Sequence, residues 1–401
     1  MSLINTENMP SRRTFLALGI TTMFTGCMTK ADDPPKAGVD EQPDPTRHIY
    51  GANGEWSSFG CNASNTRSIS DGKAPVDGVS ERWRVEVPQL MYDEPIVSNG
   101  RLFLSIPGRL EVYDVRDGSK LWTKEIDPYS TPLVRDGTVY VGDSDRLLAL
   151  DAKTGETKWK RTFDARGVVQ SPATAGGKQL YVPVGETVYR VDAKTGDIAW
   201  SRRLFGTILG SPLCSMTGLT VTTEAGKLYS LDRDRTGYAE WKLPSKPQAP
   251  PTADTDGIYV NCLDSKTYGI RTERTPRLNV DWHVETGWAN GGLAVGKHLY
   301  ASGTGGLRAI DLESGDQLWK RDTGNWRYTA PVLGRDTLFV GGDKLFAFDP
   351  TPSTGGLSGG PALRFEKAFH GRVGPGPVLD DGVLYVVAQT GEESYHLLAL
   401  H

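Results

Sequence analysis

The chain has 401 residues, of which 23% are charged and 38% hydrophobic, and its formal net charge is −4. This balance shows no basic excess, so the composition argues against a nucleic-acid partner. The four cysteines and six histidines are scattered along the chain, which excludes a disulfide framework or a metal knuckle of recognisable spacing.

The first residues carry the features of an export signal. Arg12 and Arg13 stand in the run SRRTFL, which matches a twin-arginine export motif, and a short apolar stretch follows. This stretch is far below the roughly 20 residues that span a bilayer, so we interpret residues 1–27 as a signal peptide. Thr25-Gly26-Cys27 resembles a lipobox, in which Cys27 becomes lipidated. We therefore expect an extracytoplasmic protein that is lipid-anchored to the cell membrane.

The next segment, residues 28–54, has the composition of a tether. Proline and acidic residues dominate its first part, and apolar residues are few. Such a composition is unable to build a packed core. We predict a disordered, solvated connection between the lipid and a folded domain that comprises residues 55–401.

A cassette that ends in tryptophan recurs through the folded domain. Clear copies are LLALDAKTGETKWKR at 147–161, VYRVDAKTGDIAWSRR at 188–203 and LRAIDLESGDQLWKRD at 307–322. A fixed period of this length indicates one supersecondary unit repeated several times. The closing tryptophans, spaced 37 to 41 residues apart, are Trp83, Trp122, Trp159, Trp200, Trp241, Trp282 and Trp319.

One repeat contains four predicted strands. In residues 129–163 they are Pro132–Val134, Thr138–Gly142, Leu147–Leu150 and Thr157–Arg161, separated by turns rich in Asp, Gly and Ser. The third of these strands is apolar on both faces, so both faces must be covered. Four-stranded sheets stacked face to face around an axis satisfy this requirement, with each tryptophan buried between neighbouring sheets. The sequence therefore predicts an all-β fold, a β-propeller of four-stranded antiparallel blades.

The repeats predict eight blades. The eighth repeat has only three predicted strands before the chain stops, and Arg82–Val87 has the outer-strand pattern with no repeat before it. Pairing this N-terminal strand near Trp83 with His396–Leu400 closes the ring and leaves no open edge. The predicted first strands begin near Pro95, Pro132, Pro172, Pro212, Pro251, Gly292, Pro331 and Pro377.

The cassette resembles a known repeat family. The run DAKTGETKW, with VYVG upstream and Ser-Pro at the repeat start, is similar to the PQQ-like repeat. That repeat builds the eight-bladed propellers of quinoprotein alcohol dehydrogenases and of the outer-membrane assembly factor BamB. The lead-in WSSFG at 56–60, followed by Asn65-Thr66, also resembles the segment before the first blade in many such proteins. The resemblance covers about residues 55–401 and implies the fold more strongly than a function.

Other chemical signals are weak. Cys214 and Cys262 allow a disulfide bridge, although two buried thiols are the favoured interpretation. The pairs Asp143/Asp145 and Asp232/Asp234 allow a calcium site, but both fall where a propeller turn uses Asp for local backbone hydrogen bonds. We therefore expect no metal site.

The resemblance raises the possibility of a quinone cofactor. In dehydrogenases of the family, the quinone lies in the central funnel beneath a disulfide of adjacent cysteines, near calcium and a catalytic aspartate. This chain has no adjacent cysteine pair and few insertions beyond the minimal blades. We carry over no catalytic residue, and bound PQQ with calcium is disfavoured.

The remaining candidates are surface residues. Those just before the first strands should cluster around one mouth of the central channel. Aromatic and Arg side chains on a concave rim are typical of binding hot spots. The alternative is that they pack the lip of the channel. The candidates are Glu94, Tyr129, Gln170, Trp288, Asn290, Trp326, Arg327, Tyr328 and Arg372.

These observations favour a binding or scaffold protein at the cell envelope over an enzyme. Its expected partner is a protein or a small ligand, in addition to the membrane through the lipid anchor. The alternative function is a PQQ-dependent oxidoreductase, which the missing cysteine pair and the missing insertions disfavour.

Overall fold

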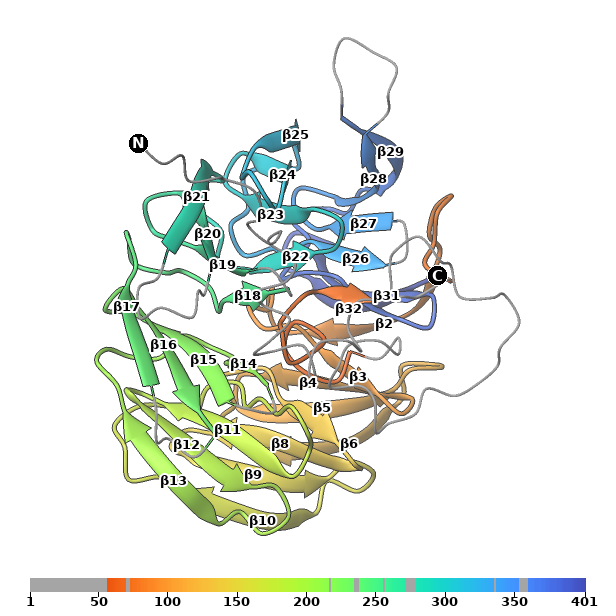
Figure 1. The fold of residues 1–401 in the computed structure, drawn as a ribbon. Coiled ribbons are helices and arrows are strands. Elements are labelled where there is room, and N and C mark those ends of the chain that lie inside the picture. The colour runs from red at the N-terminus through yellow and green to blue at the C-terminus, as the bar shows by residue number, and fades with distance from the viewer. Residues whose placement is uncertain are drawn as a thin grey trace, which may run out of the picture.

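The computed structural model describes residues 56–69, 73–215, 218–233, 238–254, 257–271, 279–334, 337–352 and 360–401. Strands joined by turns and short loops make up this part of the chain (Figure 1). In the described residues no helix is long and apolar enough to cross a membrane.

Eight antiparallel sheets, here called blades 1 to 8, follow one another along the chain. Blade 1 contains β3 (Ile96–Ser98), β4 (Arg101–Ile106), β5 (Arg109–Asp114) and β6 (Lys120–Glu125). Blade 2 contains β7 (Leu133–Arg135), β8 (Thr138–Asp143), β9 (Arg146–Asp151) and β10 (Thr157–Thr162). Blade 3 contains β11 (Gln179–Val184), β12 (Thr187–Asp192) and β13 (Ile198–Arg203), with its innermost position reduced to a bridge between Ala173 and Tyr181. Blade 4 contains β14 (Leu213–Cys214), β15 (Gly218–Thr223), β16 (Lys227–Asp232) and β17 (Tyr238–Lys242).

The second half of the ring repeats the arrangement. Blade 5 contains β18 (Thr252–Ala253), β19 (Ile258–Asn261), β20 (Lys266–Arg271) and β21 (Asn279–Glu285). Blade 6 contains β22 (Leu293–Val295), β23 (Leu299–Gly303), β24 (Gly306–Ile310) and β25 (Gln317–Arg321). Blade 7 contains β26 (Val332–Gly334), β27 (Thr337–Val340), β28 (Leu345–Pro352) and β29 (Pro361–Lys367), and β1 (Ser68–Ile69) pairs in parallel with β26. Blade 8 contains β30 (Val378–Asp380), β31 (Val383–Gln389), β32 (Tyr395–Leu400) and β2 (Glu81–Val87).

The blades form the predicted eight-bladed β-propeller. The first strand of each blade is innermost, and inner strands of successive blades contact one another, as β3 does with both β7 and β30. In Figure 1 the inner strands β18, β22 and β26 lie towards the centre, while β10, β13 and β17 lie at the outside. The second strands are also almost wholly buried, as in β8, where all six residues are buried. The predicted coverage of both faces of the middle strands is therefore confirmed.

The ring closes through the two ends of the folded domain. The outer strand of blade 8 is β2, which pairs antiparallel with β32, and Trp83 lies opposite Ala399. Beyond this ladder, Ser80 and His401 exchange two backbone hydrogen bonds of 2.8 and 3.0 Å. The predicted pairing of the N-terminal and C-terminal strands is confirmed, and it leaves no open edge between β32 and the N-terminal strand.

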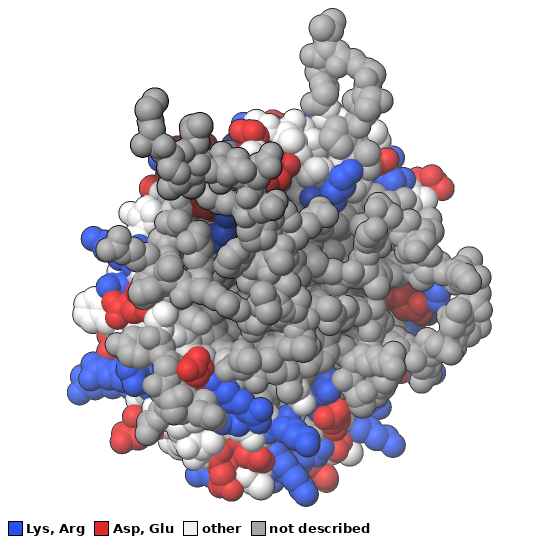
Figure 2. Space-filling model, viewed as in Figure 1, with Lys and Arg blue, Asp and Glu red and all other residues white. Residues whose placement is uncertain are grey.

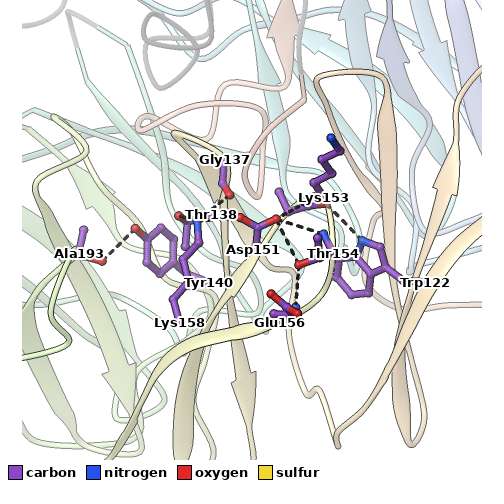
Figure 3. A network of polar contacts seen from close by, with 11 residues as sticks. Trp122, Gly137, Thr138, Tyr140, Asp151, Lys153, Thr154, Glu156, Lys158 and Ala193 are labelled. Atoms are coloured by element: carbon purple, nitrogen blue, oxygen red, sulfur yellow. Dashed lines mark hydrogen bonds and ion pairs between the residues drawn. The ribbon is translucent and has the colours of Figure 1, made fainter.

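The turn between the third and fourth strands holds its shape through one aspartate. In blade 2, the Asp151 carboxylate accepts hydrogen bonds from the backbone N–H groups of Lys153 and Thr154 at 2.9 and 3.1 Å (Figure 3). These bonds hold the pKa of Asp151 below its usual range, the Lys153 N–H contributing most, because they stabilise the ionised form. Asp192 makes the same bonds to Lys194 and Thr195 in blade 3. The run Asp-x-x-Thr-Gly is thus a turn, as predicted.

Each such turn receives a tryptophan from the preceding blade. The indole N–H of Trp122 in blade 1 donates to the Ala152 carbonyl of blade 2 at 3.3 Å, and its ring lies beside this turn in Figure 3. A Cβ atom on Gly155 would come within 2.7 Å of the same ring, and Gly155 has a φ of +74°. Glycine is therefore required twice, by the backbone and by the indole. The equivalent indole bonds, 2.8 to 3.1 Å long, join Trp83 to Val115, Trp159 to Ala193, Trp200 to Arg233 and Trp282 to Leu312.

This docking explains why the seventh repeat lacks a tryptophan. Phe365 of β29 lies opposite Ala347, the register that Trp319 holds opposite Ala309 one blade earlier. The next blade, blade 8, has no turn between its third and fourth strands, because the two ends of the propeller meet there at His401 and Ser80. An indole in blade 7 would have no Asp–Gly turn to bind, so a phenylalanine suffices.

The segment before the first blade fills the central channel. Sequence analysis identified this lead-in but did not predict its position. Residues 56–69 are almost wholly buried, and their backbone carbonyls accept hydrogen bonds of 2.8 to 3.0 Å from the inner strands of six blades. We call this segment the plug. The donor and acceptor pairs are Val97 and Trp56, Val134 and Ser57, Cys214 and Ala63, Ala253 and Ser64, Val295 and Thr66, and Leu333 and Arg67.

The plug has an irregular backbone that its surroundings impose. Cys61, Asn65 and Arg67 have φ values of +66°, +52° and +50°, which L-residues rarely adopt. The Asn65 amide donates to the carbonyls of Ser211 and Pro251 at 3.3 and 3.0 Å, so one side chain joins blades 4 and 5. Such strain persists only where many contacts fix the conformation.

The docking of tryptophan against glycine predicts an unequal effect of two alanine substitutions. Gly196 has a φ of +75°, and a Cβ there would meet Trp159 at 2.7 Å, whereas Gly137 has a φ of +67° with no atom within 4 Å. Gly137→Ala should cost only backbone strain, about 1 kcal/mol. Gly196→Ala should cost about 1–3 kcal/mol more, because it also overpacks the blade interface. Thermal unfolding of both variants checks this, and equal melting temperatures would contradict the docking role.

Candidate functional site

The predicted mouth lies where the outer strand of one blade leads into the inner strand of the next. Its floor is made by the plug and by Glu94, which precedes β3. Glu94 is only 3% exposed and forms an ion pair with Arg67 of the plug. It also accepts hydrogen bonds from the Trp56 indole at 3.1 Å and from the Gly60 N–H at 2.6 Å. Glu94 thus holds the plug in place beneath the mouth and is not exposed at the rim.

Six side chains from blades 6 to 8 and blade 1 pack together above this floor. We call this set the mouth cluster: Tyr92, Trp288, Trp326, Arg327, Tyr328 and Arg372. The Tyr328 ring lies 5.0 Å from that of Tyr92 and 5.1 Å from that of Trp326, both edge to face. The Arg327 guanidinium lies 4.7 Å over Tyr328, and the Arg372 guanidinium lies 4.6 Å over Trp326. These contacts link four predicted site residues and Tyr92 into one stack.

Trp288 joins the stack from the neighbouring blade. Its ring lies 6.0 Å from the Arg327 guanidinium, and its backbone N–H donates to Thr304 Oγ1 at 2.9 Å. The N–H of Asn290 donates to the Arg327 carbonyl at 2.8 Å, so the loops of blades 6 and 7 are tied together. The Asn290 side chain itself is exposed. The loop backbone therefore presents Trp288 and Arg327 in a fixed relation.

The members of the cluster differ in exposure. Tyr92 is 63% exposed and Trp288 is 43% exposed. Trp326 and Tyr328 are half-buried, and a Cβ on Gly374 would come within 2.6 Å of the Trp326 indole nitrogen. Trp326 therefore also packs against blade 8. Tyr92 and Trp288 are the better candidates for contact with a partner.

Besides Glu94 and Asn290, two predicted site residues lie outside the stack. Tyr129 is exposed and its hydroxyl donates to Asp127 at 2.7 Å. Gln170 is half-buried, and its backbone N–H donates to the Pro183 carbonyl at 2.9 Å. Within the described residues no ring contact or hydrogen bond joins either side chain to the mouth cluster. They share its face without sharing its packing.

Exposed apolar side chains gather on this face. Among the described residues, the large apolar side chains that are exposed fall into two groups. Those on outer strands are Leu121, Ile198, Leu318 and Leu363, and those in loops are Tyr92, Tyr129, Phe205, Leu263 and Trp288. All of the loop group lie at the ends of the blades where the mouth is. Phe205 and Leu263 were not predicted as site residues. Each is a large apolar residue in a loop between strands, and this pattern could have identified them from the sequence.

Asp93 lies between exposed Tyr92 and buried Glu94 and has an unusual acidity. Burial, and then the neighbouring charge of Glu94, raise the pKa of Asp93 from 3.8 to about 7. Both causes act against the ionised form, since a buried carboxylate loses hydration and two carboxylates repel. Asp93 is therefore partly protonated near neutral pH. It adds less negative charge to the mouth than its sequence suggests.

The cysteines are structural. Cys214 and Cys262 are buried and form no disulfide with each other, so the possible bridge between them is not formed and the buried-thiol interpretation is confirmed. Cys61 is buried in the plug. Burial raises the pKa of the Cys214 thiol and raises that of Cys262 to about 12. Both thiols are thus neutral and unreactive at physiological pH.

The residues at the mouth do not match a quinone site of the dehydrogenase type. The described cysteines are far apart in sequence, and both carboxylate oxygens of Glu94 are engaged by the plug. In the possible calcium pair, Asp143 accepts from the Asp127 N–H at 3.0 Å and pairs with Arg146 at 2.6 Å, as a turn aspartate does. Nowhere in the described ranges do three or more His, Cys, Asp or Glu side chains gather as metal ligands.

The charges on the outer rim are mixed. Along the lower edge of Figure 2, where Figure 1 places β9, β10, β12 and β13, Lys and Arg side chains alternate with Asp and Glu. Several are paired, such as Arg161 with Asp197 at 3.0 Å and Arg203 with Glu186 at 2.7 Å. This edge presents no continuous basic surface for a nucleic acid.

The raised pKa of Asp93 predicts how stability changes with pH. Its folded-state pKa of about 7 exceeds the ordinary value of 3.8, so the native protein binds the proton more tightly than the unfolded chain. The destabilisation is therefore full above pH 7 and disappears as the pH falls towards 4. Asp93→Asn removes the charge, so at pH 8.5 it should raise the free energy of unfolding by about 1–2 kcal/mol and raise the melting temperature with it. At pH 4 the substitution should change the stability little.

The exposed Asp117 provides a control of opposite sign. A hydrogen bond from Ser119 lowers the pKa of Asp117, so Asp117→Asn should give no gain at high pH. Melting curves of both variants across the pH range test this. A pH-independent effect of Asp93→Asn would contradict the assignment.

Comparison with known proteins places this architecture in a family. The family model described as outer membrane protein assembly factor BamB matches residues 76–168, 166–274 and 303–400. The crystal structure of BamB from Moraxella catarrhalis is similar with a TM-score of 0.60 and 17% identity, covering 80% of this chain and 97% of that chain. Quinohemoprotein alcohol dehydrogenase from Comamonas testosteroni is similar with a TM-score of 0.65 and 14% identity, covering 86% of this chain and 80% of that chain. The computationally designed Ika8 protein has a TM-score of 0.61 and 11% identity, covering 80% and 99% of the two chains.

At these identities, the structural matches show the fold alone. The search of curated proteins finds no match. The family match extends over most of the propeller, from blade 8 at residue 76 round to residue 400. The chain belongs to the PQQ-like repeat family of outer membrane protein assembly factor BamB.

Proposed function

We propose that this protein is a lipid-anchored propeller of the cell envelope that binds a partner protein at its mouth cluster and catalyses no reaction. The main support for binding at the mouth is the stack of aromatic and arginine side chains, with Tyr92 and Trp288 exposed at its edges. Rings held by their neighbours lose little conformational entropy on binding, so they make strong anchors. The blade interfaces have their own tryptophans, and an exposed ring at the mouth is not needed for that packing.

The breadth of the apolar face favours a protein as the partner. The exposed loop side chains come from several blades, from Tyr92 before blade 1 to Phe205 before blade 4 and Trp288 before blade 6. Stable protein interfaces cover about 800 Å² on each partner, an area larger than a small ligand contacts. A surface spread over several blades is suited to such an interface.

The envelope location rests on the N-terminal motifs and the family. Arg12, Arg13 and Cys27 lie outside the described residues, as does the tether of residues 28–54. The spacing of the SRRTFL motif and the Thr-Gly-Cys run supports export and lipidation at Cys27. The name of the matched family, outer membrane protein assembly factor, supports a function at the envelope.

Lipidation at Cys27 has a direct test. Cys27→Ser removes the acceptor thiol, so the protein should move from the membrane fraction to the soluble fraction. Arg12→Lys with Arg13→Lys should instead leave unprocessed precursor in the cytoplasm. Fractionation and immunoblotting of both variants measure these outcomes. Unchanged membrane association of Cys27→Ser would overturn the lipid anchor.

Partner binding at the mouth is tested by crosslinking in the native membrane followed by affinity capture. Tyr92→Ala with Trp288→Ala should reduce partner recovery, because truncating hot-spot aromatics costs about 2 kcal/mol or more, a factor of about 30 in affinity. Both residues are exposed, so the melting temperature should stay the same. Leu121→Ala with Leu318→Ala is the matched control, since these exposed side chains lie on outer strands.

Two results would contradict the proposal. Equal recovery with the mouth variant and the outer-strand control would show that the partner binds elsewhere. Quinone absorbance that remains with the protein after PQQ and calcium are added, together with alcohol oxidation, would instead establish the oxidoreductase alternative.

A further inference from the structure

Two guanidinium groups of the mouth cluster have no acidic partner. Arg372 is exposed and lies over Trp326, and Arg327 is half-buried and lies over Tyr328. Arg327 donates a hydrogen bond of 2.6 Å to the Tyr328 hydroxyl, and no carboxylate in the described part of the chain pairs with either arginine. Other arginines of the propeller do pair with carboxylates, such as Arg116 of a turn with Asp114 and Arg146 of β9 with Asp143, each at 2.6 Å.

The two carboxylates that follow Tyr92 in the chain, Asp93 and Glu94, do not pair with these arginines. Arg67 neutralises Glu94 below the mouth. The raised pKa of Asp93, about 7, leaves part of its population uncharged near neutral pH. The stack of the mouth cluster therefore carries two guanidinium charges without a carboxylate partner in the described residues, although the whole chain has a net charge of −4.

The stacking also prepares the two arginines for a ligand. A guanidinium has five N–H donors, so one that lies over a ring, as Arg327 and Arg372 do, keeps several of them for hydrogen bonds to a ligand, even though Arg327 already donates one to Tyr328. Those N–H groups match the two oxygens of a carboxylate, and the stacked side chain has already lost much of its freedom. Arg327 and Arg372 are thus oriented donors separated by the Trp326 and Tyr328 rings.

We propose that the mouth cluster recognises an acidic peptide segment of its partner, whose carboxylates pair with Arg327 and Arg372 while its apolar side chains contact Tyr92 and Trp288. This inference rests on the proposed function and adds the chemistry of the partner. A peptide rather than a small anion is favoured because exposed apolar side chains continue across the face beyond the two arginines, at Phe205 and Leu263.

The test uses a fluorescent peptide in which Glu and Phe alternate, with matched peptides that carry Gln or Lys in place of Glu. The full-length protein should bind the Glu peptide at least about tenfold more tightly than the Gln peptide, a difference of about 1.4 kcal/mol, and the Lys peptide least. Raising the salt concentration from about 0.1 to about 1 M should lower the affinity for the Glu peptide, because the Debye length falls from about 10 to about 3 Å. Fluorescence anisotropy measures each affinity.

Variants separate the two arginines from overall charge. Arg327→Gln with Arg372→Gln should lower the affinity for the Glu peptide about tenfold and leave that for the Gln peptide unchanged. Arg84→Gln with Arg116→Gln removes the same charge from exposed sites away from the cluster and from Phe205, and it should change neither affinity. Thermal melting confirms that both proteins are folded.

Several outcomes would overturn the inference. Equal affinity for the Glu and Gln peptides would do so, as would an unaffected arginine variant. Displacement of the peptide by PQQ at a comparable concentration would assign the two arginines to a small anion. The proposed function is judged separately: if the arginine variant still captures the partner while Tyr92→Ala with Trp288→Ala does not, the mouth is the binding site but the partner segment is not acidic.

Discussion

The bond between the indole N–H of one blade and a turn carbonyl of the next is the contact on which the propeller depends. It occurs at five tryptophans, from Trp83 with Val115 to Trp282 with Leu312. At Trp83, Trp122, Trp159 and Trp282 the ring is also close to the turn glycine. Sheets packed only by apolar area could slide, because hydrophobic contact has no direction. A hydrogen bond at one point and a glycine of positive φ at another fix both the distance and the angle between blades. The loops of the mouth connect neighbouring blades, so the fixed spacing of the blades also fixes the positions of these loops.

The plug gives the same structure a second, central support. The inner edges of the blades would otherwise carry unpaired N–H groups at the axis, and buried unpaired groups are costly. The plug carbonyls accept from six of these edges, and Arg67 extends from the plug to Glu94 below the mouth. The outer docking sets the spacing of blades, while the plug closes the channel and fixes the floor of the site. Binding at the mouth is therefore a surface event.

The periodic parts of the sequence predicted the structure well, and its irregular parts did not. Regular tryptophan spacing and two-faced apolar strands are local patterns, so they predicted the blades and the pairing of Trp83 with the last strand. The plug is rich in Ser and Asn and looks like a surface loop, because the carbonyl bonds that allow its burial come from residues far away in sequence. For the same reason Glu94 was expected at the rim, and its partner Arg67 was not foreseen. At the site, Trp288, Arg327 and their neighbours were predicted from their position before the inner strands, but the stacking between them depends on side-chain directions that no spacing reveals.

The closure of blade 8 has a consequence for the order in which the protein can be made. The strand β2, Glu81–Val87, leaves the ribosome long before its partner β32, Tyr395–Leu400. The plug is likewise synthesised before the inner strands that it contacts, the last of which donates from the Leu333 N–H of blade 7 to the Arg67 carbonyl. Contacts between such distant segments form late, because a long loop must close before they are gained. The earliest part of the propeller therefore remains without its native partners until blades 7 and 8 have been synthesised, so the ring closes only after all eight blades have been made.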